Sequence, residues 1–170
     1  MNPSRRHGHD VAFYQRHHVG TNDQKKETIM SQQSLIDAAK ALDIAYGEKN
    51  WDAVRASVAP NVLYDEVATH RKMQGVDQLI AVWQGWATAF PDSKATFRSA
   101  FVSGNTVVLE VTWRGTHRGP LHTPGGQIPA TGKTFELPAC QIIEIADGKA
   151  KSMRQYFDMA TLMQQLGIAA

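Results

Sequence analysis

The 170-residue sequence has a single cysteine, Cys140, and no long apolar run. One cysteine excludes a disulfide within the chain, and a thiol in an apolar strand is more often inert than reactive. No apolar stretch approaches the length that spans a bilayer, so no membrane partner is expected. The N-terminal residues are charged and lack the apolar core of a signal peptide, so we expect a cytoplasmic location.

A strong excess of charge is also lacking, because the formal net charge is only +2. Residues 1–29 hold five Lys/Arg against three Asp/Glu, together with four of the seven histidines, which leaves thirteen charges of each sign in residues 30–170. A neutral body argues against nucleic acid as the partner.

The basic N-terminal segment shows no hydrophobic periodicity, whereas "MSQQSLIDAAK" from Met30 looks like a true start. We expect residues 1–30 to be a disordered extension, or an overlong start assignment, and residues 31–170 to form one domain. The hydrophobic content of 42% is enough for its core.

Helical spacing of apolar residues predicts three helices before the main run of strands. They cover about 34–47, the stretch "NWDAVRASVAP" that Pro60 should end, and a segment from Gly75 to Pro91 with a wide apolar face. A short strand, "NVLYDEVA", separates the second helix from the third, and a polar connection follows it.

The second half of the chain predicts β-strands. Gly104-Asn105 and Asp147-Gly148 mark two hairpins, a Gly/Pro-rich connection lies between them, and Asp158 and Gly167 bound a final short helix. This order indicates an α+β fold. We expect a curved antiparallel sheet wrapped against three to four helices as an open cone (an α+β barrel), a shape that suits a small-molecule cavity.

The strand "PACQIIEI" carries a glutamine on its apolar face. Alternation groups Gln141 with Leu137, Ala139, Ile143 and Ile145, while Glu144 lies on the opposite face. A buried amide needs hydrogen-bond partners, so Gln141 is either satisfied inside a core or lines a polar pocket.

Several motifs together resemble a known family. They are "AFPD", "TWRGTHRG", "IPATGKTFELPACQIIEIADGK" and "FDMATLMQQLG". The body from about residue 33 to 168 resembles the SnoaL-like polyketide cyclases of the nuclear-transport-factor-2-like (cystatin-like cone) superfamily.

The resemblance implies ring closure by intramolecular aldol condensation without cofactor or metal. It also implies an acid/base carboxylate on the strand before the ADGK turn, where this chain has Gln141. An amide cannot carry the proton, although it can donate a hydrogen bond to a developing enolate.

Candidate acids and bases occur elsewhere. Asp65 and Glu66 are adjacent on a strand, so at most one of them points into the cavity. His70 follows in a polar loop, where exposure is the default.

The remaining candidates would contact substrate. Arg154 and Tyr156 share one face of the last strand, and an inward Arg154 could anchor an anion, although a rim position or a dimer face is the competing interpretation. His117 and His122 lie in the long connection, where exposure is again the default, and two loop histidines do not make a metal site. Trp83 fits the core stripe of the third helix. The full set of expected substrate contacts is Tyr64, Trp83, Trp113, His117, Arg154 and Tyr156.

Two functions stay open at this point. The first is a cofactor-independent cyclase or isomerase acting on a hydrophobic carbonyl compound, with Asp65 or Glu66 as base, Gln141 as hydrogen-bond donor and His70 as a further candidate. The second is a binding protein that kept the cone without the chemistry. Epoxide hydrolysis on the same cone would need Arg154 and two acids to converge, and the sequence offers too few inward carboxylates.

Apolar residues behind the Gln141 strand, such as Ile142, also predict a homodimer through the open sheet face.

Overall fold

The computed structural model describes residues 30–123 and 126–168. The expected disordered extension, apart from Met30, lies outside the described residues. Within the described ranges, no helix has both the length and the apolar character needed to cross a membrane.

The described residues form four α-helices, and side chains cap three of their N-termini. The Ser31 hydroxyl accepts from the Ser34 N–H, the Asn50 side chain accepts from the Ala53 N–H, and Asp158 caps the last helix. These caps satisfy amide groups that a helix leaves unpaired. The helices are α1 (Gln32–Gly47), α2 (Trp51–Ser57), α3 (Val76–Ala89) and α4 (Met159–Leu166), with a short 3₁₀ turn η1 (Val67–Thr69).

Six strands build the main sheet in the order β2-β1-β8-β7-β4-β3. Neighbouring strands run antiparallel, except that β1 and β8 are parallel. Its strands are β1 (Val58–Glu66), β2 (Arg71–Gln74), β3 (Lys94–Ser103), β4 (Thr106–Thr116), β7 (Thr134–Ala146) and β8 (Lys149–Phe157). Two short strands in the long connection, β5 (Leu121–Thr123) and β6 (Gly126–Ile128), pair only with each other.

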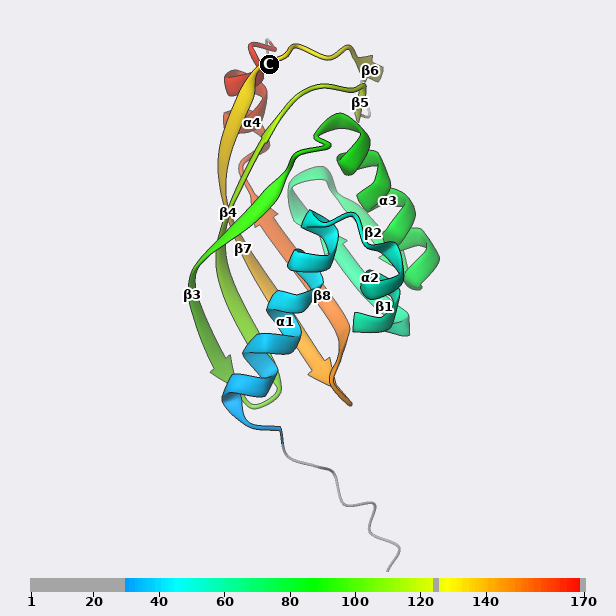
Figure 1. The fold of residues 1–170 in the computed structure, drawn as a ribbon, viewed down its shortest axis with the longest axis vertical. Coiled ribbons are helices and arrows are strands. Elements are labelled where there is room, and N and C mark those ends of the chain that lie inside the picture. The colour runs from blue at the N-terminus through cyan, green and yellow to red at the C-terminus, as the bar shows by residue number, and fades with distance from the viewer. Residues whose placement is uncertain (1–29, 124–125, 169–170) are drawn as a thin grey trace, which may run out of the picture.

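The sheet curls around the helices, as Figure 1 shows. Helix α1 lies across the concave face, α2 and α3 continue that layer, and α4 packs near one end of β7. The hydrophobic core fills the space between α1, α3 and the inner face of the sheet. This arrangement confirms the α+β cone expected from the order of the elements.

Two local predictions were wrong. Helix α2 ends at Ser57, and Pro60 lies inside β1 and does not end the helix. A proline is accommodated there because the pairing of β1 with β8 is interrupted between Val58 and Leu63, so a missing N–H is tolerated. The expected polar connection after β1 contains the edge strand β2.

The strand β7 has the predicted orientation. Ala139, Gln141 and Ile143 are buried on the inner face, whereas Cys140 and Ile142 are only partly covered on the outer face. Gln141 pairs with Leu109 of β4 on one side and with Gln155 of β8 on the other. The glutamine therefore lies inside the cone.

A close backbone contact fixes the end of α3. The Gly119 N–H donates to the Ala89 carbonyl at 3.2 Å, and a Cβ at position 119 would lie 2.1 Å from the Thr88 carbonyl oxygen. Only glycine fits against α3 this closely, because any other residue would overlap that carbonyl. The contact lies next to Phe90, which follows α3 and lines a cavity inside the cone.

Candidate functional site

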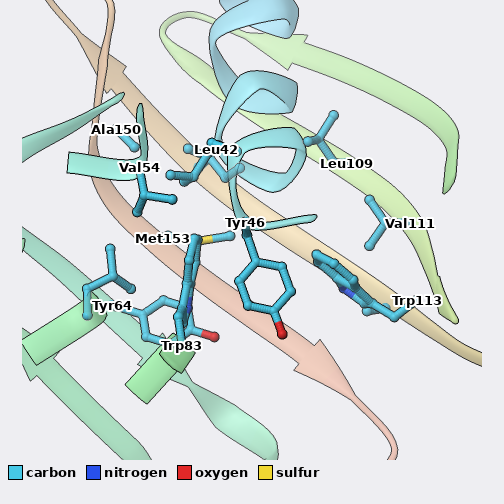
Figure 2. Close-up of a cluster of buried hydrophobic side chains, with 14 of the residues drawn as sticks. Leu42, Tyr46, Val54, Tyr64, Trp83, Leu109, Val111, Trp113, Ala150 and Met153 are labelled. Atoms are coloured by element: carbon cyan, nitrogen blue, oxygen red, sulfur yellow. The ribbon is translucent and has the colours of Figure 1, made fainter. Parts of the chain in front are cut away.

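An aromatic cavity lies inside the cone between α1, α3 and the sheet. Its free volume is about 70 Å³, about half the ~150 Å³ of an apolar cavity that binds benzene. A ligand of ring size therefore requires lining side chains to move. Figure 2 shows Tyr46 projecting from α1 between Trp83 and Trp113, with Tyr64 beside Trp83. Trp86, Phe90, Phe135, Leu137, Phe157 and Leu162 complete the apolar wall, and the polar lining groups are Asp43, Tyr46, Tyr64, Glu66, Ser93 and Gln155.

Asp43 of α1 is a buried carboxylate in the wall. Its side chain is 1% exposed, and its Oδ2 has no hydrogen-bond partner among the described residues. Burial raises the pKa of Asp43 from 3.8 to about 7, and the hydrogen bond from Gln141 opposes this shift. A carboxyl group with this pKa holds and releases a proton near neutral pH.

Gln141 holds that carboxylate in place. Its Nε2 donates to Asp43 Oδ1 at 3.1 Å and to Gln155 Oε1 at 3.4 Å, and the residue is fully buried. It is absent from the cavity lining and stands behind Asp43. Gln141 is therefore hydrogen-bonded to side chains inside the cone, and it reaches the cavity only through Asp43 and Gln155.

A chain of hydrogen bonds continues from Gln141 to the other side of the cavity. Gln155 Oε1 lies 3.3 Å from the Tyr64 hydroxyl, which lies 3.2 Å from Glu66 Oε2. The single Tyr64 hydrogen can donate to only one of these two acceptors at a time. The chain thus links two buried carboxylates, Asp43 and Glu66, through neutral side chains.

Glu66 is the inward member of the Asp65–Glu66 pair. Its side chain is 1% exposed and ion-paired with Arg71. Thr69 and Arg71 donate to its Oε1, and the Trp86 indole N–H donates to its Oε2 at 2.8 Å. Asp65 points outward and lies 3.8 Å from Lys72. Glu66 is therefore the member of the pair that lies inside the cone, and its oxygens already accept hydrogen bonds from Thr69, Arg71 and Trp86.

Three of the expected substrate contacts line the cavity, namely Tyr64, Trp83 and Trp113. The cavity position expected for Arg154 and Tyr156 is wrong, since both are exposed on the outer face of β8. The inner face of β8 carries Met153 and Gln155 instead. A register shift where β7 pairs with β8, between Glu144 and Ile145, breaks the simple alternation that the sequence suggests.

Two of the three candidate histidines are exposed, which was the default expectation, and the third is buried. His70 is exposed in a left-handed conformation (φ 55°), and His122 is exposed in β5. His117 is fully buried, contrary to the default of exposure, and packs 5.2 Å from the Phe90 ring without lining the cavity. Its Nδ1 accepts from the Thr131 N–H at 3.3 Å. His117 therefore anchors the loop that precedes β7.

Comparison with known proteins gives this arrangement a family. The family model described as SnoaL-like polyketide cyclase matches residues 36–166, which is most of the described chain. The chain belongs to the SnoaL-like polyketide cyclase family. No curated protein sequence matches the chain.

Several solved structures share the fold of this SnoaL-like protein. A SnoaL-like polyketide cyclase candidate from Jannaschia sp. CCS1 is 20% identical with a TM-score of 0.72, over 86% of this chain and 99% of that one. TsrD from Streptomyces laurentii is 24% identical with a TM-score of 0.70, over 82% and 99%. A protein with a ketosteroid isomerase-like fold from Catenulispora acidiphila is 18% identical with a TM-score of 0.67, over 78% and 94%. At these identities, the likeness shows the fold.

The SnoaL-like site also contains residues that the sequence reasoning missed, chiefly Asp43, Tyr46 and Gln155. A signal for Asp43 exists, because it follows Leu35 and Ala39 at four-residue intervals on the apolar stripe of α1. Gln155 gives no such signal. Within residues 30–123 and 126–168, no cluster of three or more His, Cys, Asp or Glu side chains is arranged to hold a metal ion.

Proposed function

We propose that this SnoaL-like protein catalyses proton transfer at the carbon next to a carbonyl group of a small hydrophobic compound, as in aldol-type cyclisation or isomerisation. The observation that carries the proposal is the free oxygen of Asp43. A buried carboxylate with one oxygen held by Gln141 and the other unpartnered lies against an aromatic cavity.

Asp43 is the general base in this proposal. Since burial raises the pKa of Asp43 to about 7, both its protonation states are populated at neutral pH. That match between the pKa and the working pH favours acid/base catalysis. Gln141 donates to Oδ1 and so presents Oδ2 to the cavity.

Glu66 has a different part. Its oxygens already accept hydrogen bonds from Arg71, Thr69 and Trp86, so taking a substrate proton would disrupt these bonds. We assign Glu66 to holding Trp86 and Tyr64 in the cavity wall. Asp65 and His70 are exposed or turned outward and take no part.

The reaction balances without an oxidant or a reductant. Asp43 Oδ2 takes a proton from the carbon next to the carbonyl, and the electron pair of that C–H bond moves to the carbonyl oxygen as an enolate. In an aldol closure the enolate carbon attacks a second carbonyl carbon of the same molecule, and the alkoxide that forms on the second oxygen takes the proton from Asp43. In an isomerisation the proton returns to a different carbon. Asp43 regains its starting form in both cases.

Deuterium uptake by cyclopentanone in D₂O, followed by NMR, tests the proposal. We expect the wild-type protein to accelerate exchange at the carbons next to the carbonyl. Asp43→Asn should remove roughly 10²- to 10⁴-fold of that acceleration. Asp37→Asn is the matched control, because Asp37 is an exposed carboxylate of the same helix. Equal exchange rates in the wild type and Asp43→Asn would overturn the proposal.

A second candidate function is a binding protein on the same cone. The observation that favours it is the amide of Gln141 on the strand before the ADGK turn, where the family resemblance implies a carboxylate. Cyclopentanone that binds to the wild type without any exchange above the buffer rate would select this function over catalysis.

We also propose a homodimer through the outer face of the sheet. Phe101 of β3 is 60% exposed there and pairs with Val108 of β4. Ile142 of β7 and Arg154 of β8 continue this row across the sheet. Asp65 of β1 follows Arg154 in the same row. An apolar row that ends in opposite charges suits a two-fold contact between copies.

A further inference from the structure

Tyr46 lies one helical turn after Asp43 and lines the same cavity. The residue is 7% exposed, and its ring makes edge contacts with Trp83 at 5.4 Å and Trp113 at 5.3 Å. Figure 2 shows its hydroxyl directed away from α1, between these two rings. The position of the phenol is therefore fixed by the packing on both sides.

A lysine and a serine support the Tyr46 hydroxyl. It lies 3.1 Å from Ser93 Oγ, and Lys49 Nζ donates to Ser93 Oγ at 3.3 Å. Lys49 also donates to the Ser93 carbonyl at 3.3 Å and lies 4.2 Å from the centre of the Tyr46 ring. Ser93 is buried and lies between the Tyr46 hydroxyl and Lys49, which is half-buried.

The direction of these hydrogen bonds follows from the donors available. A lysine ammonium can only donate, so Ser93 Oγ accepts from Lys49. The Ser93 hydrogen then has the Tyr46 oxygen as its only acceptor among the described residues. With Ser93 donating to it, Tyr46 keeps its own hydrogen free for a group in the cavity. Burial raises the pKa of Tyr46 to about 12, so the phenol retains that proton.

Trp113 supplies a second donor. The side chain is 9% exposed and lines the cavity, and its Nε1 has no partner among the described residues. A buried indole N–H normally has an acceptor. The unpartnered donor therefore points to a ligand atom that accepts a hydrogen bond at this position.

We propose that the Tyr46 hydroxyl and the Trp113 indole N–H bind the carbonyl oxygen of the substrate, and that Ser93 and Lys49 orient and polarise Tyr46. This inference rests on the proposed function, because it supplies the electrophilic half of the same proton transfer. As Asp43 removes the proton, negative charge develops on the carbonyl oxygen, and both donors stabilise it. Fixed donors at a developing oxyanion are among the largest contributions to catalysis.

The pairing of groups defines the class of ligand. Asp43, whose Oδ2 is an unpartnered acceptor, and the two donor residues Tyr46 and Trp113 line one aromatic cavity. A neutral ketone or ester with an acidic neighbouring C–H satisfies all three, since the C–H meets the carboxylate and the oxygen meets the donors. A free carboxylate ligand does not fit, because it would add a further negative charge beside the carboxyl groups of Asp43 and Glu66.

Cyclopentanone labelled with ¹³C at the carbonyl carbon provides a readout that does not need turnover. Hydrogen bonding to the carbonyl oxygen moves the carbonyl resonance downfield. We expect a downfield shift on binding to the wild type. Tyr46→Phe should lose most of it, Trp113→Phe part of it, and Ser93→Ala and Lys49→Met an intermediate part. Lys49→Arg, which keeps the charge and the donors, should restore the wild-type shift.

Lys94→Met is the matched control for Lys49→Met. Lys94 is the exposed residue next to Ser93 and makes no hydrogen bond to its hydroxyl, so its removal should leave the carbonyl resonance in place. In the exchange assay, Tyr46→Phe should lower the rate by about 10²- to 10³-fold. Lys49→Met should lower kcat more than it raises KM.

The two proposals fail differently. A bound carbonyl that is polarised by Tyr46 but not exchanged would reject the role of Asp43 and keep the donor site. Exchange that depends on Asp43 with a carbonyl resonance unchanged in Tyr46→Phe would reject the donor site and keep the base. A shift lost equally in Lys94→Met and Lys49→Met would overturn the role of Lys49.

Discussion

Asp43 and Gln141 are 98 positions apart in the sequence, and their side chains meet at 3.1 Å inside the cone. The amide donates to one carboxylate oxygen and leaves the other free. The strand that the family resemblance marks for an acid/base carboxylate thus carries an amide that holds a carboxylate from α1. In our proposal the acid/base group is therefore on the helix, hydrogen-bonded to the strand residue at the position that the resemblance marks.

Burial of Asp43 makes the stability of the protein depend on pH. The folded protein keeps the Asp43 proton up to a pKa of about 7, whereas the unfolded chain releases it near 3.8. Because the folded pKa is raised, the contribution of Asp43 to stability is greatest below about pH 4 and is lost as the pH rises to about 7. The difference corresponds to on the order of 4 kcal/mol.

Urea denaturation of the wild type and Asp43→Asn from pH 4.5 to 8 measures this effect. The free energy of unfolding of the wild type should fall relative to that of Asp43→Asn across this range. Asp37→Asn should run parallel to the wild type. A constant difference between the wild type and Asp43→Asn would contradict the raised pKa.

Removal of Arg71 should destabilise the protein through Glu66. Arg71 ion-pairs with Glu66, which is 1% exposed, and the loss of one partner leaves a buried charge uncompensated. We expect Arg71→Met to cost about 3 kcal/mol of unfolding free energy. The double variant Arg71→Met/Glu66→Gln should recover part of the loss, because the amide carries no charge. Arg55→Met, which removes an exposed ion pair with Asp77, is the control and should change little.

The sequence predicted those features that depend on local pattern. Alternation placed Gln141 on the inner face, and Asp147-Gly148 marked the turn between β7 and β8. Asp43 was missed because a carboxylate is normally exposed, even when its position falls on the apolar stripe of a helix. Its burial depends on the sheet that packs against α1, which the sequence of the helix does not show. The sequence left open which face of β8 carries Arg154, because the register shift beside Ile145 depends on strand pairing, which the sequence of β8 alone does not determine.

Acid should loosen the loop that His117 anchors. His117 Nδ1 accepts from the Thr131 N–H, which requires the neutral ring. Burial lowers the pKa of His117, so its contribution to stability is full above its ordinary pKa of about 6.5 and is lost as the pH falls. His117→Asn keeps an acceptor in place without titrating. Thermal unfolding should therefore show the wild type losing Tm relative to His117→Asn between pH 7.5 and 5, and equal losses would contradict this role.

The proposed homodimer predicts a mass that depends on Phe101. Sedimentation equilibrium at tens of micromolar, a range suited to moderate affinity, should show a dimer for the wild type. Phe101→Asp should shift it to a monomer, because it places a charge in the apolar row. Ile44→Asp, which changes an exposed residue of α1 (49% exposed) away from the sheet face, should leave the dimer intact. A wild-type monomer under these conditions would reject the dimer.

Gln141→Leu should move the pH dependence of exchange and not only its height. The hydrogen bond from Gln141 stabilises the charged form of Asp43 and lowers its pKa, in opposition to burial. Its removal raises the pKa further, so a smaller fraction of Asp43 is ionised at pH 7. The rise of the cyclopentanone exchange rate with pH should therefore occur at higher pH in Gln141→Leu than in the wild type. In an Asp43→Asn background, Gln141→Leu should leave the residual rate and its pH dependence unchanged, because the carboxylate through which it acts is gone. If the exchange rate of Gln141→Leu rose at the same pH as in the wild type and was only lower at every pH, Gln141 would act on the substrate and not on Asp43.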